Sequence, residues 1–139
     1  MSTQNFKNHA QFVPLFHFFL SSVCIAILVL ASINLYHGVT LPSVMFFLIA
    51  IASIVGWYIM RSFPIKAQDR AIRAEENLRY FTLTGKLLDK NLRMSQIVAL
   101  RFADDEEFVE LADKALKNNM SNKDIKQAIQ NWRADHHRV

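Results

Sequence analysis

Histidine is the residue type in this chain best suited to holding a redox cofactor, and the sequence contains five: His9, His17, His37, His136 and His137. A b-type haem held between two helices needs two inward-facing histidines at a similar depth. His17 lies near one end of an apolar stretch and His37 lies beyond its other end, so the two cannot ligate one haem within a single chain. Two copies of His17 in a dimer could do so. The alternative, which we favour, is that His17 is an interfacial aromatic residue with a polar tip. We therefore expect no cofactor and keep His17 as the one candidate ligand.

The remaining candidates do not predict a metal site. His136 and His137 follow Asp135, but adjacent residues point in different directions on a helix, and neither a cysteine nor a second carboxylate supports them. The single cysteine, Cys24, lies in the middle of an apolar run and can form no disulfide within one chain. We expect it to be a buried, unreactive thiol.

Two pairs of carboxylates have the composition of acid–base catalysts: Glu75 with Glu76, and Asp104 with Glu107. Both pairs also have a structural explanation, the first as part of a solvated helix face and the second as negative charge at a helix N-terminus. The chain has only three glycines and shows neither a glycine-rich phosphate loop nor a Ser/His/Asp constellation. We predict no catalytic residue and a protein that is not an enzyme.

The elements that must position these residues belong to two different kinds of chain. Residues 1–60 contain one charged side chain, Lys7, whereas residues 61–139 contain 15 basic and 12 acidic side chains. Residues 13–36 and 41–60 are almost wholly apolar, and about 20 residues at about 1.5 Å each cross the roughly 30 Å of a bilayer core. We therefore predict transmembrane helices over 13–36 and 41–60. The loop 37–40 is so short that the two helices must be antiparallel neighbours.

Basic residues predict the orientation of this hairpin. The loop 37–40 contains no Lys or Arg, whereas Arg61, Lys66, Arg70 and Arg73 follow the second span. Because such residues stay on the cytoplasmic side, we expect segment 1–12 and tail 61–139 in the cytoplasm and the loop on the other side. The protein is then a multi-pass protein of the cytoplasmic (inner) membrane. Nucleic acid is not the favoured partner, because the charges after the second span alternate in sign.

The tail 61–139 predicts a small helical domain. After Pro64, five apolar residues spaced 4, 3, 4 and 3 apart mark a narrow seam on a charged helix that ends at Thr84-Gly85: Ala67, Ala71, Ala74, Leu78 and Phe81. A second short helix is expected over about 93–102, and Asp104 with Glu107 forms the capping-box pattern that opens a third. No segment alternates as a strand would. The predicted fold class is an all-α membrane protein, a two-helix transmembrane hairpin followed by a small cytoplasmic helical domain.

The final predicted helix follows a second capping pattern, Ser121 with Asp124. Its apolar stripe has the i, i+3, i+4, i+7 spacing of one helix face: Ile125, Ala128, Ile129 and Trp132. A helix this short is marginal in water by itself, so the stripe must be buried. It packs either on the Phe108, Ala112 and Leu116 face of the preceding helix or against a protein partner. We favour the first; in the second, Ile125, Ile129 and Trp132 are the candidate partner contacts.

Three segments carry a resemblance to a known family: NFKNHAQFVPLFHF, RSFPIKAQDRAIRAEENLRYF and RMSQIVALRFADDEEFVELADKALKNNMSNKDIKQAIQNWRADHHRV. In them the chain resembles an uncharacterised family, a domain of unknown function, of small bacterial two-span membrane proteins. The resemblance implies a bacterial cytoplasmic-membrane location. It implies no particular activity, substrate or catalytic residue.

For function, we favour a non-catalytic accessory or interaction subunit whose cytoplasmic tail docks a partner. A tail of about 75 residues forms only a marginal core by itself. Besides the lipid bilayer, we therefore expect a protein partner or a second copy, bound through the hairpin or the tail. The alternative is a haem- or quinone-binding redox subunit formed by a dimer of hairpins.

Overall fold

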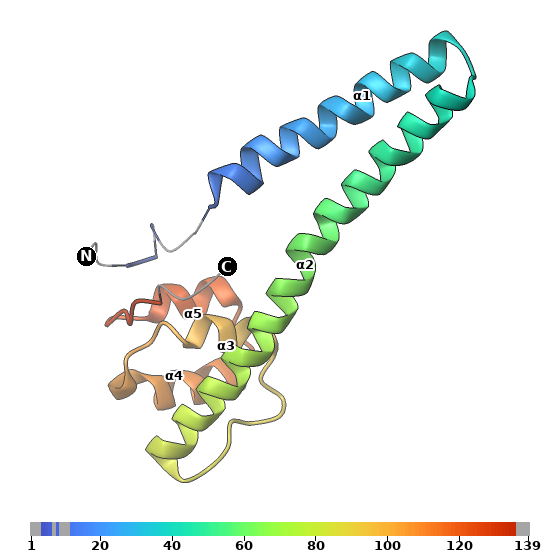
Figure 1. Cartoon of the computed structure of the whole chain (residues 1–139). Coiled ribbons are helices and arrows are strands. Elements are labelled where there is room, and N and C mark those ends of the chain that lie inside the picture. Colours follow the sequence, from blue (N-terminus) through green and yellow to red (C-terminus); the bar gives the residue numbers. More distant parts are fainter. Residues whose placement is uncertain (1–3, 7, 9–11, 136–139) are drawn as a thin grey trace. The chain divides into compact units, whose positions relative to one another are not determined.

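The structure is a computed structural model that describes residues 4–6, 8 and 12–135. Every regular element in these residues is helical (Figure 1): the π-helix η1 (Leu15–Leu20), α1 (Ser21–His37), α2 (Leu41–Thr84), α3 (Met94–Leu100), α4 (Asp105–Lys117) and α5 (Asn122–Ala128). This confirms the predicted all-α class. The chain divides into two compact units, one formed by Gln11–Pro64 and the other by Met1–Ala10 with Ile65–Val139.

The first unit contains η1, α1 and the first part of α2, and it exposes most of its apolar surface. Two helical stretches, Leu15–His37 and Leu41–Thr84, are long and apolar enough to cross a membrane. Only 11% of the most apolar window of each stretch is buried. The buried residues are small ones, Cys24, Ala31, Ser43 and Ala50. These helices are therefore not the covered core helices of a soluble domain.

Hydrogen bonds at the turn before α2 fix the start of this helix. The Ser43 hydroxyl donates to the carbonyl oxygen of Gly38 at 2.7 Å, and the amide of Thr40 donates to the Ser43 hydroxyl at 2.8 Å. The amide of Ser43 donates to the Thr40 hydroxyl at 3.3 Å. These bonds satisfy donors that a helix start leaves without an intrahelical partner. Pro42, in the first turn, has no such donor to satisfy.

The second helix begins at Leu41, as predicted, but it does not end near Met60. It continues through Pro64 to Thr84. An interior proline removes one backbone hydrogen bond and destabilises a helix by about 3 kcal/mol. Half of the residues between Pro64 and the end of α2 are Ala, Arg, Glu, Lys or Gln, which are strong helix formers and offset this cost. The change from an apolar to a charged sequence therefore occurs within one helix.

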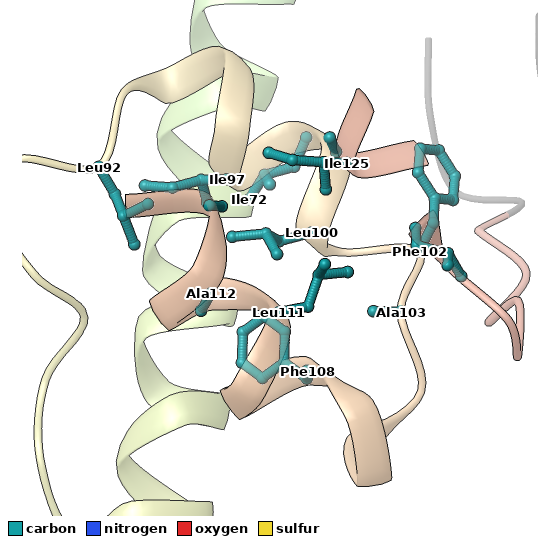
Figure 2. Packing of buried hydrophobic residues seen from close by; sticks show 13 residues of the cluster. Ile72, Leu92, Ile97, Leu100, Phe102, Ala103, Phe108, Leu111, Ala112 and Ile125 are labelled. Carbon is teal, nitrogen blue, oxygen red and sulfur yellow. The ribbon is translucent and has the colours of Figure 1, made fainter. Parts of the chain in front are cut away.

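The second unit has one apolar core, to which the last part of α2 and the helices α3, α4 and α5 contribute (Figure 2). The core residues are Ile72, Leu92, Ile97, Ala99, Leu100, Phe102, Ala103, Phe108, Leu111, Ala112, Ala115, Ile125 and Ile129. The Phe108 ring meets Tyr80 of α2 edge-on, with ring centroids 6.0 Å apart. These contacts build a compact helical domain from the predicted tail.

Two local features of the domain agree with the sequence. The predicted helix end at Thr84-Gly85 is confirmed, and Gly85 has a φ of 72°, the left-handed conformation that glycine adopts at helix ends. The predicted cap of α5 is also confirmed. The Ser121 hydroxyl accepts from the amide of Asp124 at 3.2 Å, and the Asp124 carboxylate accepts from the amide of Ser121 at 3.1 Å.

Two other expectations for the domain are wrong. Asp104 precedes α4 as predicted, but no capping box forms there. The Glu107 carboxylate instead accepts from the amides of Gln130 and Asn131, at 3.1 and 3.0 Å. The final helix ends at Ala128, because Ile129 is extended and the next two amides are bonded to Glu107 rather than to their own helix. Trp132 therefore lies beyond the helix, in an isolated bridge with Ala103.

Candidate interaction surfaces

His17, the candidate cofactor ligand, lies in η1 with its ring close to its own helical turn. Its Nδ1 atom is 3.0 Å from the carbonyl oxygen and 3.1 Å from the amide nitrogen of Val13. The ring meets Phe12 and Phe16 edge-on, with ring centroids 5.5 and 5.3 Å away. His37 is the last residue of α1, about 20 residues and roughly 30 Å further along. One haem therefore cannot reach both His17 and His37 of a single chain.

The structure describes only some of the other candidate ligands. His9, His136 and His137 lie outside the residues that the structure describes. In the described part, no three His, Cys, Asp or Glu side chains are placed to hold a metal ion. Cys24 is a buried free thiol, as predicted.

The residues of the predicted C-terminal stripe lie within the domain. Ile125 and Ile129 are buried in its core, and Trp132 is half-buried with its ring centroid 5.2 Å from that of Phe102. The helix α5 packs mainly against α3 and less against α4, the neighbour we expected. These three side chains are covered by their own chain, so they do not form an exposed docking face.

Arg79 ties α2 to the segment between α3 and α4. Its guanidinium donates to Glu76 at 3.1 Å, to the carbonyl oxygen of Ala103 at 2.7 Å and to the carboxylate of Asp105. It also lies over the ring of Phe108, 4.3 Å from the centroid. The carbonyl oxygen and the two carboxylates bind the N–H groups of the guanidinium, and the aromatic ring packs against its flat face. Arg79 therefore has a structural role, and sequence reasoning missed it because its partners outside α2, Ala103, Asp105 and Phe108, lie 24 to 29 residues away.

Glu76 is buried, although the sequence predicted a solvated Glu75-Glu76 pair. Glu75 is exposed as expected, whereas Glu76 is 6% exposed beneath Arg79. Burial raises the pKa of Glu76 above its ordinary value, and the positive charge of Arg79 opposes part of that shift. The prediction failed for Glu76 because adjacent residues on a helix point about 100° apart, so one can be covered while the next is not.

Gln96 is the second buried polar side chain of the domain that holds elements together. Its amide nitrogen donates to the carbonyl oxygens of Ala115 at 3.2 Å and Met120 at 3.0 Å. Its amide oxygen accepts from the amide of Arg93 at 2.9 Å. Gln96 thus caps the start of α3 and joins it to the end of α4. Like Arg79, it has a structural role that fully accounts for its burial.

A segment before η1 belongs to the same compact unit as the C-terminal domain. The side-chain oxygen of Gln4 accepts from the amide of Asp135 at 2.8 Å, and its side-chain nitrogen donates to the carbonyl oxygen of Asp135 at 3.4 Å. The Asp135 carboxylate in turn lies 3.2 Å from the guanidinium of Arg101. Residues 131 positions apart in the sequence are therefore joined.

The helix α2 presents one face to the core of this domain and a different face outward. Ile72, Glu76 and Tyr80 are buried or half-buried, whereas every residue of the predicted seam is exposed: Ala67, Ala71, Ala74, Leu78 and Phe81. The apolar spacing that the sequence shows most clearly is thus not the surface on which the domain is built.

Comparison with known proteins gives a family without an assigned activity. The chain matches no curated protein and no solved structure. A family model described as a family of unknown function, DUF6526, matches residues 1–139, and the chain therefore belongs to this family.

Proposed function

We propose that this protein is a two-span membrane protein whose tail is a non-catalytic interaction domain held at the cytoplasmic surface. The exposed apolar helices support membrane insertion. The side chains of Leu30, Phe46 and Leu48 are about 60% exposed and lie in stretches long enough to cross a bilayer. Water would strongly disfavour that much continuous apolar surface, whereas lipid would cover it.

The observation that carries the proposal is that residues on both sides of the two spans belong to one compact unit. Gln4 precedes the first span, Asp135 follows the second, and the two share hydrogen bonds. Segments that contact each other in water must lie on the same side of a membrane. An even number of crossings between them, as in a hairpin, satisfies this requirement.

Charge supports the cytoplasm as that side. The residues between the two long helices, 38–40, carry no Lys or Arg, whereas Arg61, Lys66, Arg70 and Arg73 follow the second span. Positively charged segments of this length are retained in the cytoplasm during insertion. The proposed topology therefore has both chain ends in the cytoplasm and residues 38–40 on the opposite side.

A non-catalytic role is supported by what the buried polar residues do. In the described part of the domain they are Glu76, Gln96 and Arg101, and each has a partner within the fold. Glu76 bonds to Arg79 of its own helix, Gln96 bonds to Ala115 of α4, and Arg101 pairs with Asp135. Polar groups in an active site usually point into a cleft and away from structural partners. We therefore infer that the domain acts by presenting its surface, as an accessory or interaction subunit.

Labelling of introduced cysteines with a membrane-impermeant maleimide tests the topology. The background is Cys24→Ala, which carries no thiol, and the test variants add Val39→Cys in the loop or Lys117→Cys at the end of α4. Both positions are exposed. In cells whose outer membrane is permeable to the reagent and whose cytoplasmic membrane is intact, we expect Val39→Cys to react. Lys117→Cys should react only after the cytoplasmic membrane is permeabilised. Reaction of Lys117→Cys in intact cells would overturn the orientation, and release of the protein by carbonate washing would overturn membrane insertion.

A further inference from the structure

The seam of α2 is a line of apolar residues that the domain core leaves exposed. It consists of Ala67, Ala71, Ala74, Leu78 and Phe81, and its two large residues, Leu78 and Phe81, are 64% and 48% exposed. We propose that this seam binds the same seam of a second copy of the chain, forming a parallel two-stranded coiled coil. The pairing rests on the proposed anchoring of both copies in one membrane, whichever side of that membrane the tail occupies.

The spacing of the seam is that of a coiled coil. Steps of 4, 3, 4 and 3 residues average 3.5, the period that keeps one apolar line facing a partner helix. Ala71 and Leu78 occupy the first apolar position of each heptad, and Ala67, Ala74 and Phe81 occupy the second. A helix that only covered its own domain would not need this second apolar line.

The domain packs on the opposite side of the same helix. At about 100° per residue, the face centred on Glu76 lies half a turn around the axis from the centre of the seam. Ile72 and Tyr80, on that opposite face, contact the domain core. A second helix can therefore cover the seam without displacing any buried residue of the domain.

Charges beside the seam favour parallel over antiparallel pairing of two copies of the chain. Arg70 and Glu75 are exposed and flank the apolar line on opposite sides, five residues apart. In a parallel pair, Arg70 of each copy faces Glu75 of the other, which forms two symmetric ion pairs. In an antiparallel pair, like flanking positions face each other, so Glu75 would approach Glu75. Among the described residues, neither side chain forms a salt bridge within its own chain.

Confinement to a membrane makes so short a seam sufficient. About four helical turns with three alanines bury little apolar area, and such a pair would be weak in dilute solution. Two copies anchored in one bilayer with the same topology are already parallel and at a high effective concentration. The alanines near Pro64 also allow the two backbones to approach closely.

Cysteine cross-linking in native membranes tests the pairing. In the Cys24→Ala background, Leu78→Cys and Ala71→Cys should each give a disulfide-linked dimer under mild oxidation, because identical positions meet across a parallel seam. The matched control is Arg73→Cys, an exposed residue on the same helix that lies off the seam. We expect at least fivefold less dimer from it. Equal yields from Arg73→Cys and Leu78→Cys would overturn the seam. Cross-linking only in a mixture of Ala67→Cys and Phe81→Cys chains would overturn the parallel direction.

Exchanging the two charges tests the proposed ion pair between Arg70 and Glu75 separately. Added to the Leu78→Cys chain, Arg70→Glu should lower the dimer yield several-fold, because two carboxylates then face each other. Adding Glu75→Arg to that variant should restore the yield. A double variant that stays as low as the single one would overturn the assigned ion pairs, whereas restoration supports them.

These outcomes are separable from those of the membrane test. If Lys117→Cys is labelled from outside while Leu78→Cys still forms dimers, the topology fails and the seam stands. If labelling gives the proposed topology but neither Ala71→Cys nor Leu78→Cys forms a dimer, the seam fails alone.

Discussion

The two parts of α2 expose apolar residues in different patterns. Between Leu41 and Pro64, large apolar side chains are exposed on every side of the helix, as at Met45, Phe46 and Leu48. Between Ile65 and Thr84, one face packs on a core while a line of apolar residues on the opposite face is exposed. Exposure on all sides matches an apolar solvent, whereas a narrow exposed line flanked by charges matches another protein surface. One helix therefore indicates two kinds of environment.

Polar side chains differ between the two parts in the same way. In the first part, the Ser53 hydroxyl donates to the carbonyl oxygen of Ile49 at 2.8 Å, so this side chain finds its partner within its own helix. In the second part, Glu76 and Arg79 bond to each other, and Arg79 also bonds to the α3–α4 segment. In the second part, the buried charge of Glu76 thus has a partner that the fold supplies.

Replacing one ring in each environment would show this contrast most strongly. Phe108 is fully buried in the domain, and Phe108→Ala should lower its free energy of unfolding by about 3–5 kcal/mol, enough to unfold a domain this small. Phe46 is more than half exposed, so Phe46→Ala leaves no protein cavity and should leave the domain unchanged. Urea unfolding of the full chain in detergent, followed by circular dichroism, measures both. A large loss of domain stability from Phe46→Ala, or none from Phe108→Ala, would contradict the contrast.

A pH titration would test the buried carboxyl of the second part, with a smaller effect. Burial raises the pKa of Glu76 above 4.5, so the folded domain holds this proton more tightly than the unfolded chain does. From about pH 4.5 up to the raised pKa, the free energy of unfolding should therefore fall as pH rises. Glu76→Gln, which cannot titrate, should lack this component. Identical pH slopes for the wild type and Glu76→Gln in this range would contradict burial of the carboxyl.

Asp124 is the matched control for that titration, because its pKa is shifted in the opposite direction to that of Glu76. Hydrogen bonds from Ser121 lower the pKa of Asp124 below 3.8. Its contribution to stability is therefore present above pH 3.8 and is lost as pH falls through the lowered pKa. Asp124→Asn should change only this acidic range and leave the Glu76 component in place.

The sequence predicted the elements whose signals are local. The helical class, the start of α2 at Leu41, its end at Thr84-Gly85 and the Ser121 cap each depend on residues within four positions of one another. The features it missed depend on distant partners. The helix α5 stops at Ala128 because Glu107, more than 20 residues earlier, binds the next two amides. No periodicity in residues 125–132 contains that information.

The same limit explains which face of α2 was identified. The seam from Ala67 to Phe81 is apolar and regular, so a sequence pattern finds it. The buried face includes Glu76 and Arg79, whose burial depends on Asp105 and the carbonyl of Ala103. Polar residues that are buried through long-range bonds resemble solvated residues in a sequence. The sequence pattern thus identified an exposed surface of α2 and missed the face of α2 that packs against the domain core.

The smallest expected effect concerns His17, in the apolar unit. Its ring is close to the backbone of Val13 and packs against Phe12 and Phe16, as an aromatic residue near a membrane surface would. We therefore predict that His17→Phe retains expression, membrane insertion and dimer cross-linking through Leu78→Cys. The visible spectrum of the purified wild type should show no Soret band. A band that disappears in His17→Phe would show that His17 is needed to bind a haem and would favour the redox alternative. In that case the exposed apolar surface of the first unit would serve a cofactor site, and lipid would no longer be sufficient to explain its difference from the second part of α2.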